Sequence, residues 1–145
     1  MTAPAPPVPA PEVALETLSE AARLNREDAL RDGSLLRFPD YGQLVMTGDL
    51  HGHVGNFAKL QRYAALDRTP VRHVVLHEMI HEDCWPGQPD RSFYLLLEAA
   101  RYKCDYPDQV HFLQSNHELA QLVGQRIGKG GRDVVREFED AIRLS

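Results

Sequence analysis

The sequence predicts an α/β fold in which parallel strands are joined by helices. Short apolar runs alternate with longer segments whose apolar residues recur at helical spacing. Glycine and proline residues separate the two kinds of segment. This alternation is typical of β-α-β crossovers, which place successive strands side by side in one parallel sheet. A length of 145 residues suits a single domain.

The expected elements follow one another along the chain. Residues 1–11 are rich in Pro and Ala and predict a flexible tail, so that residues 12–145 form the domain. An amphipathic helix begins at Glu12 and stops near Gly33. Strands are expected at 43–48, 71–76 and 109–114. Further helices are expected at 53–66, 92–104, 119–127 and 133–144.

The composition argues against several classes of protein. The formal net charge is -5 and the Lys and Arg residues are scattered, so no basic surface is expected for nucleic acid or for a membrane. The two cysteines are too few for a disulfide framework, which favours a reducing compartment. No apolar run approaches the length that spans a bilayer. We therefore expect a soluble, cytoplasmic protein.

Three clusters of chemically active side chains follow the three expected strands. They are GDLHGH at 48–53, LHEMIHED at 76–83 and SNHEL at 115–119. In parallel sheets, functional groups collect just beyond the carboxyl ends of the strands. The three loops are therefore expected to converge on one cleft.

Asp49 and His51 form the chemical core of the first cluster. Residues i and i+2 of an extended segment point the same way, so this carboxylate and this imidazole can hold one cation. The alternative is a loop carboxylate that is hydrogen-bonded to its neighbour. The position directly after a strand, between two glycines, favours the metal site.

Asn116 and His117 are the counterpart after the third strand. The amide oxygen of Asn116 can ligate a metal, and the imidazole of His117 can ligate a metal or transfer a proton. The alternative is a helix N-cap next to a surface histidine. Because the other two clusters are expected at the same edge of the sheet, we favour a role in metal binding or proton transfer.

The middle cluster also satisfies the zinc-peptidase pattern His-Glu-x-x-His, from His77 to His81. That chemistry needs the pattern inside a helix, with both histidines on one face. The preceding run VRHVVL instead predicts a strand that ends near Leu76, after which a turn would separate the two side chains. A zinc metallopeptidase is therefore our third hypothesis.

The three clusters together resemble the motifs of the calcineurin-like metallophosphoesterases. The family pattern runs GDxHG, GDxxDRG and GNHE, followed by two later histidines. GDLHGH, the pair at 77–78 and SNHE follow its order and approximate spacing. The run SFYLLLEAARYKCDYPDQVHFLQSNHELAQL resembles the serine/threonine phosphoprotein phosphatase branch, and DVVREFEDAIRL resembles the helix that follows there. The resemblance covers roughly residue 42 to the end.

The resemblance implies an α/β sandwich around two divalent or trivalent metal ions, Mn, Fe or Zn, that activate a bridging hydroxide to attack phosphorus. Asp49 and His51 would bind the first ion, Glu78 would bridge both, and Asn116 would bind the second. His117 would protonate the leaving oxygen or stabilise the transition state. The expected activity is hydrolysis of a phosphate monoester, on a phosphoprotein or another phosphorylated substrate.

Several positions depart from the family pattern. His77-Glu78 replaces Gly-Asp, His81 replaces the Asp that orients the general acid, and Glu82 replaces the phosphate-binding Arg. Arg91 in the following loop is a candidate substitute for that Arg, and a solvated loop charge is the alternative. His77 and His81 are candidates for unorthodox metal ligands.

The chain also stops at Ser145, before the two later histidines and the second half of the family sheet. We therefore expect a domain truncated relative to the family, corresponding to its amino-terminal half. The leading hypothesis is a phosphoesterase, and the alternative is a noncatalytic module or fragment. A half-sandwich would leave apolar strands uncovered, which predicts self-association or a second chain that completes the domain.

Overall fold

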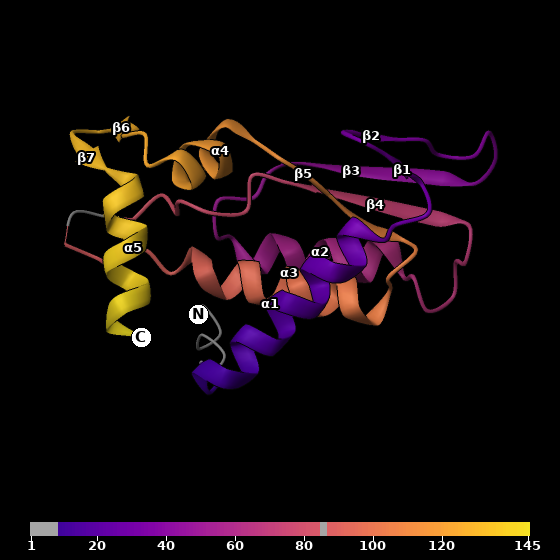
Figure 1. Cartoon of the computed structure of the whole chain (residues 1–145), viewed down its shortest axis with the longest axis horizontal. Coiled ribbons are helices and arrows are strands. Elements are labelled where there is room, and N and C mark those ends of the chain that lie inside the picture. Colours follow the sequence, from indigo (N-terminus) through magenta and orange to yellow (C-terminus); the bar gives the residue numbers. More distant parts are fainter. Residues whose placement is uncertain (1–8, 85–86) are drawn as a thin grey trace.

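The structure is a computed structural model that describes residues 9–84 and 87–145. Its helices are α1 (Pro11–Arg26), α2 (Val54–Ala64), α3 (Ser92–Asp105), α4 (Asn116–Val123) and α5 (Val134–Leu144). Its strands are β1 (Arg31–Asp32), β2 (Leu35–Leu36), β3 (Gln43–Asp49), β4 (Arg72–His77), β5 (Val110–Leu113), β6 (Gly128–Lys129) and β7 (Arg132–Asp133). Figure 1 shows the main sheet as one layer, with α2 and α3 beneath it and α1 against α3.

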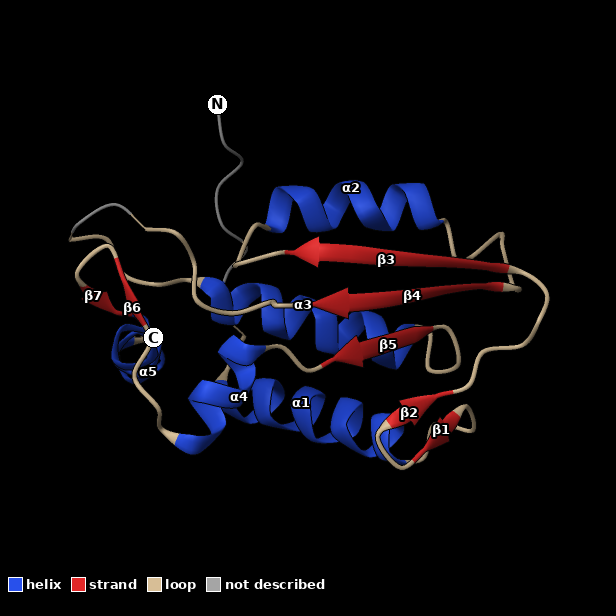
Figure 2. Ribbon diagram, turned by 90° about the horizontal axis from the view of Figure 1, so that it is seen from above, coloured by secondary structure: helices blue, strands red, loops and turns tan. Residues whose placement is uncertain are grey.

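The main sheet has three strands in the order β3-β4-β5, and both pairings are parallel. α2 crosses from β3 to β4, and α3 crosses from β4 to β5 (Figure 2). The predicted α/β class, with parallel strands joined by helices, is therefore confirmed. Because all three strands run the same way, their carboxyl ends meet at one edge. α4, α5 and the β6-β7 hairpin lie beyond that edge.

The core lies between the sheet and the two crossover helices. The side chains of Val74, Leu76 and Val110 are fully buried there against Phe57 of α2 and Leu95 of α3. Burying one such side chain stabilises the fold by about 1.5–3 kcal/mol. The strand β4 is central, and Val74, Val75 and Leu76 are buried in succession although they point to alternate faces, so the strand reads as a continuous apolar run.

The opposite face of the sheet is only partly covered. Leu44 and Met46 of β3 and Leu113 of β5 are exposed on the strands, and Leu35 is exposed on β2. A hollow of about 770 Å³ lies on this side, where the β1-β2 hairpin meets Met46 and Val75. Within residues 9–84 and 87–145, the only other ladders are the two hairpins of two-residue strands. The described chain is thus a sheet with one helical layer.

A buried ionic cluster joins the loop after α1 to the sheet. Asp28 accepts a hydrogen bond from Lys103 Nζ (3.2 Å) and lies 2.7 Å from His111 Nδ1. His73 Nδ1 in turn lies 3.1 Å from His111 Nε2. The side chains of Lys103 and His111 are fully buried, and the ring of Phe38 packs edge-on against both imidazoles. These contacts hold the α1-β1 loop against α3 and β5.

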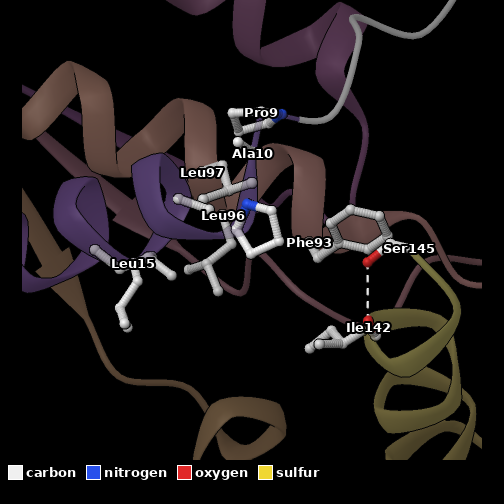
Figure 3. Close-up of a pocket in the computed structure, with 11 residues that line it drawn as sticks. Pro9, Ala10, Leu15, Phe93, Leu96, Leu97, Ile142 and Ser145 are labelled. Carbon is white, nitrogen blue, oxygen red and sulfur yellow. Dashed lines mark hydrogen bonds between the residues drawn. The ribbon is translucent and has the colours of Figure 1, made fainter.

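An apolar hollow of about 520 Å³ lies between α1, α3 and α5. Figure 3 shows Leu15 of α1, Phe93 and Leu97 of α3 and Ile142 of α5 around it. Leu15 and Ile142 are exposed, whereas Phe93 and Leu97 also pack in a small core against Phe138. None of the described helices is both long and apolar enough to cross a membrane.

Three boundaries differ from the sequence-based expectations. The first helix begins at Pro11, which we had placed in the tail, because proline suits the first turn of a helix. Residues 1–8 of the expected tail lie outside the described residues. The same helix ends at Arg26 instead of near Gly33, because the buried Asp28 accepts a hydrogen bond from Leu30 N and turns the chain into the β1-β2 hairpin.

The third difference bears on the site. The SNHE segment was expected in a loop, with a helix from 119 to 127, but α4 begins at Asn116 and ends at Val123. Ser115 caps the helix by accepting hydrogen bonds from the backbone N–H groups of His117 and Glu118. Gly124 ends it in the left-handed conformation. Asn116 and His117 are therefore held on the first turn of a helix.

Candidate metal centre

Two loops at the carboxyl edge of the sheet are fastened to each other by backbone hydrogen bonds. Asp49 pairs with His77 at the ends of β3 and β4. Beyond this pair, the N–H groups of Leu50 and His51 both donate to the carbonyl oxygen of Glu78, at 2.9 and 2.8 Å. These bonds place Asp49, His51, His77 and Glu78 side by side. The first two sequence clusters therefore meet, as expected for parallel strands.

The backbone at this edge adopts conformations that non-glycine residues rarely take. His51, Glu78 and His81 have positive φ angles of 40°, 47° and 65°. Each such residue costs roughly 1–3 kcal/mol, and such residues cluster at functional sites. Gly52, also at positive φ, cannot be replaced without a clash, because a Cβ there would lie 2.9 Å from Ser92 Cβ. The loop geometry is thus imposed by its surroundings.

A buried cluster of His51, Glu78 and His117 could hold a metal ion. His117 Nε2 lies 3.2 Å from Glu78 Oε1, and His51 Nε2 lies 3.7 Å from the same oxygen. One ligand atom from each of the three residues lies within 4.8 Å of the other two. Imidazole nitrogens and a carboxylate are a donor set that suits Zn, Fe or Mn.

A second donor set lies beside the first and shares Glu78. Its other members are Asp49 and His77, whose Oδ1 and Nδ1 atoms are 3.0 Å apart. His77 Nδ1 is also 3.9 Å from Glu78 Oε2. Glu78 therefore turns one oxygen toward each set. The side chain of Glu78 is 6% exposed and that of Asp49 56%, so the second set is the more open one.

The surroundings of Glu78 and His117 disfavour the charged form of each side chain. Burial, together with the hydrogen bond and charge of Asp49, raises the pKa of Glu78. Burial also lowers the pKa of His117, and the imidazoles of His51 and His81 act in the same direction. A charged Glu78 carboxylate is therefore costly here, and so is a charged His117 imidazole. A cation between the donor atoms would offset the cost of ionising Glu78.

Glu118 supports the strained loop from the first turn of α4. Its Oε1 atom accepts a 2.7 Å hydrogen bond from Met79 N, directly after Glu78. Its other oxygen binds Ser115, which completes a capping box. Sequence reasoning did not single out Glu118 for this role. The Ser-x-x-Glu spacing was the signal that could have found it.

His81 lies outside both donor sets. Its Nδ1 atom is 2.8 Å from His117 Nδ1, and its Nε2 atom is 2.8 Å from Gln121 Oε1. Both ring nitrogens are thus engaged by protein atoms, which argues against the expectation that His81 is a metal ligand. His77, by contrast, belongs to the second donor set. Gln121 was not identified from the sequence, and no motif there marks it.

The zinc-peptidase hypothesis is contradicted by the backbone of residues 77–81. His77 is the last residue of β4, and Glu78 and His81 have left-handed conformations, so the segment is not a helix. The side chain of His77 faces Asp49, whereas that of His81 faces His117. The two histidines therefore do not form the one-faced pair that this chemistry requires.

Two other expected site residues are exposed at the edge of the cluster. Asn116 is the first residue of α4, and Arg91 precedes α3. In the part of the chain that the structure describes, no hydrogen bond joins either side chain to the cluster. The backbone N–H of Arg91 donates to Glu82 Oε2 at 3.1 Å. The expected roles in metal and phosphate binding thus remain predictions.

A hollow of about 570 Å³ opens beside Asp49 and His51. Glu82, Asp83 and the backbone of the first turn of α2 also line it. Burial raises the pKa of Glu82, and the charge of nearby Asp90 adds to this effect. The approach to the cluster is therefore acidic.

No protein-family model matches the chain, and no curated protein matches it either. The class of the site consequently rests on its geometry. The fold and the site define a parallel α/β domain with a buried His/Glu cluster, at the carboxyl ends of its strands, that could bind a metal ion.

Proposed function

We propose that the chain is a metal-dependent phosphoesterase that hydrolyses phosphate monoesters at this cluster. The observation that carries the proposal is the sharing of Glu78 by two adjacent donor sets. A carboxylate that faces two donor sets can hold two ions close together, as two-metal catalysis of phosphate transfer requires. The resemblance of GDLHGH and SNHE to the metallophosphoesterase motifs supports the same reaction class.

In this proposal, His51, His117 and Glu78 hold one ion, and Asp49, His77 and Glu78 hold the other. Bound ions would lower the pKa of water, orient the phosphate oxygens and neutralise developing charge. The protein contributes the strained loops that fix the donor atoms, and Glu118 holds the loop that carries Glu78. We assign His117 first as a ligand, because its Nε2 atom faces Glu78, and its expected role as a proton donor stays a prediction.

The acidic hollow beside the cluster makes the proposed activity strictly dependent on metal. A phosphate dianion that approaches Asp49, Glu82 and Asp83 is repelled unless cations compensate the carboxylates. We therefore infer that ions bind before the substrate. The chain should have no measurable phosphatase activity after treatment with a chelator.

The test is hydrolysis of p-nitrophenyl phosphate by the chelator-treated chain, with Mn²⁺, Zn²⁺ or Fe²⁺ added back. Glu78→Gln is expected to reduce kcat/KM by more than the roughly 10–100-fold that the loss of a metal's supporting residue costs. Asp108→Asn, an exposed acid distant in sequence, is the control and should leave the rate unchanged. Equal rates for Glu78→Gln and the unaltered chain would refute the proposal.

A second candidate is a noncatalytic module that binds metal but does not turn over a substrate. Glu82 favours it, because this acid stands where the family pattern has a phosphate-binding Arg, and it accepts a bond from the backbone of Arg91. Metal binding without hydrolysis of any phosphate monoester would support this candidate. Turnover that is lost in Glu78→Gln would exclude it.

A further inference from the structure

We propose that Gln121 and Glu139 are positioning residues for His117. Together with His81 they form a hydrogen-bonded relay that selects one tautomer of His117 and turns an unprotonated nitrogen toward Glu78. The proposal rests on the proposed metal site for its function. The relay itself is a property of the metal-free chain and can be tested there.

The orientation of the Gln121 amide is the first step. Its Nε2 atom lies 3.3 Å from Oε1 of Glu139, and its Oε1 atom lies 2.8 Å from His81 Nε2. An ionised carboxylate only accepts hydrogen bonds, so the –NH₂ end of the amide must face Glu139. The other oxygen of Glu139 lies 3.8 Å from the guanidinium of Arg143. The carbonyl end of Gln121 therefore faces His81.

The tautomer of His81 follows from this orientation. Because Gln121 Oε1 is an acceptor, His81 Nε2 carries a proton and donates it. In neutral His81 the Nδ1 atom is then an acceptor. Its partner at 2.8 Å is Nδ1 of His117, which must donate. His117 is consequently the Nδ1–H tautomer, and its Nε2 lone pair faces Glu78 Oε1 at 3.2 Å.

The tautomer of His51 is set by a single contact with the backbone. Its Nδ1 atom lies 2.9 Å from the backbone carbonyl oxygen of Ile80, which can only accept. In neutral His51 the Nε2 atom therefore carries the lone pair, and it lies 3.7 Å from Glu78 Oε1. Two imidazole lone pairs and a carboxylate oxygen then converge. Such convergence suits a cation.

Burial protects the hydrogen bonds of the relay from competition by water. His81 is fully buried and His117 is 8% exposed, so solvent has little access to the hydrogen bond between them. The ring of Phe138 packs edge-on against His81 at 5.7 Å, and the backbone N–H of His81 donates to Ser92 Oγ at 2.9 Å. The position of His81 is thus determined from both sides. The open end of the relay is Glu139 on α5.

The test uses the full chain with ¹⁵N-labelled histidine, free of metal, at about pH 8, above the ordinary pKa of histidine. Long-range ¹H–¹⁵N correlation spectra distinguish protonated from unprotonated ring nitrogens. His117 is expected to show a protonated Nδ1 and an unprotonated Nε2. The opposite pattern in the unaltered chain would overturn the proposal, whether or not the chain binds metal.

Two variants and two controls complete the experiment. Gln121→Met keeps the length of the side chain but removes the relay, and Glu139→Gln removes the constraint on the amide. Both are expected to mix the His117 tautomers and to weaken Zn²⁺ binding by roughly 10–100-fold. Gln125→Met and Asp140→Asn, at exposed positions near α4 and on α5, should change neither readout.

The outcomes separate the two proposals. Unchanged tautomers in both relay variants would overturn the relay even if metal binds. A selected tautomer in a chain that binds no metal would keep the relay as a structural feature and reject the metal site. Thermal melting of each variant verifies that the fold is retained.

Discussion

The Nε2 atom of His117 lies 3.2 Å from Oε1 of Glu78, although His117 belongs to α4 and Glu78 follows β4. This contact joins the second and third strand-end clusters, and the backbone bonds between the loops of Glu78 and His51 join the first. Glu78 thus contacts residues from both of the other strand-end clusters. Its carboxylate is buried, and its pKa is raised chiefly by that burial.

The number of bound ions should depend on which carboxylate is removed. We expect Asp49→Asn to lose one ion, because Asp49 belongs only to the more open donor set, whereas Glu78→Gln should lose both. Metal content after dialysis, measured by plasma mass spectrometry, checks this. Asp108→Asn is the control. Equal stoichiometry in all three variants would show that the ions bind elsewhere.

Removing Glu118 should destabilise the fold. Glu118→Ala leaves the N–H of Met79 without its 2.7 Å partner in a buried loop, which costs about 1–3 kcal/mol. The free energy of unfolding from urea titration is the measurement. Glu12→Ala removes an exposed acid from the first turn of α1 and is the matched control. If both variants lose the same stability, the bond to Met79 contributes nothing.

Stability should decrease on acidification because of His111. Burial lowers the pKa of this imidazole, so the unfolded chain binds a proton at a higher pH than the folded chain does. Below the unfolded pKa of about 6.5, the free energy of unfolding should therefore fall as pH falls. Urea titrations between about pH 8 and 5 measure the slope.

His111→Gln should reduce that slope, because it removes one group that takes up a proton on unfolding. His53→Gln is the control: this exposed histidine caps α2 by accepting a hydrogen bond from Asn56 N, so the change lowers the free energy of unfolding, but it should keep more of the slope than His111→Gln does. Asp28, the ionic partner of His111, should respond in the same direction at lower pH. Hydrogen bonds and charges from Leu30, His111 and Lys103 outweigh desolvation and lower the pKa of Asp28, so its contribution is lost as pH falls through that pKa.

The uncovered face of the sheet should promote self-association. Leu44 and Met46 of β3 and Leu113 of β5 expose apolar surface on the two outer strands of the sheet, and β3 is an edge strand with unpaired backbone groups. Light scattering at increasing concentration should show a rising average mass. Met46→Lys should suppress the rise, whereas Val13→Lys, on the exposed side of α1, should not. A constant monomer mass for the unaltered chain would contradict this prediction.

The sequence predicts much of this architecture because parallel strands obey simple rules. Asp49, Glu78 and His117 follow three different strands, and a parallel sheet brings those ends to one edge. The short ladders β1-β2 and β6-β7 carry no comparable signal, since two-residue strands have no periodicity. The end of α1 was missed because it depends on Asp28, whose burial requires His111 and Lys103 from distant segments.

The supporting residues of the centre were harder to predict. Gln121 and Glu139 lie on α4 and α5, and their contact depends on how these helices meet. The sequences of α4 and α5 do not indicate that Gln121 contacts His81 or that Glu139 contacts Gln121. His81 was expected as a possible ligand because its residue type suits metals. Its left-handed backbone and its 2.8 Å contact with His117 could not be read from the residue type.

The helix α5 carries two features that the sequence places about one turn apart. Glu139 ends the relay toward His117, and Ile142 lines the apolar hollow between α1, α3 and α5 (Figure 3). A packed helix moves largely as a rigid unit, so a molecule that fills the hollow and shifts α5 also changes the contact of Glu139 with Gln121. By thermodynamic linkage, such a molecule and the metal ion would alter each other's affinity by the same factor.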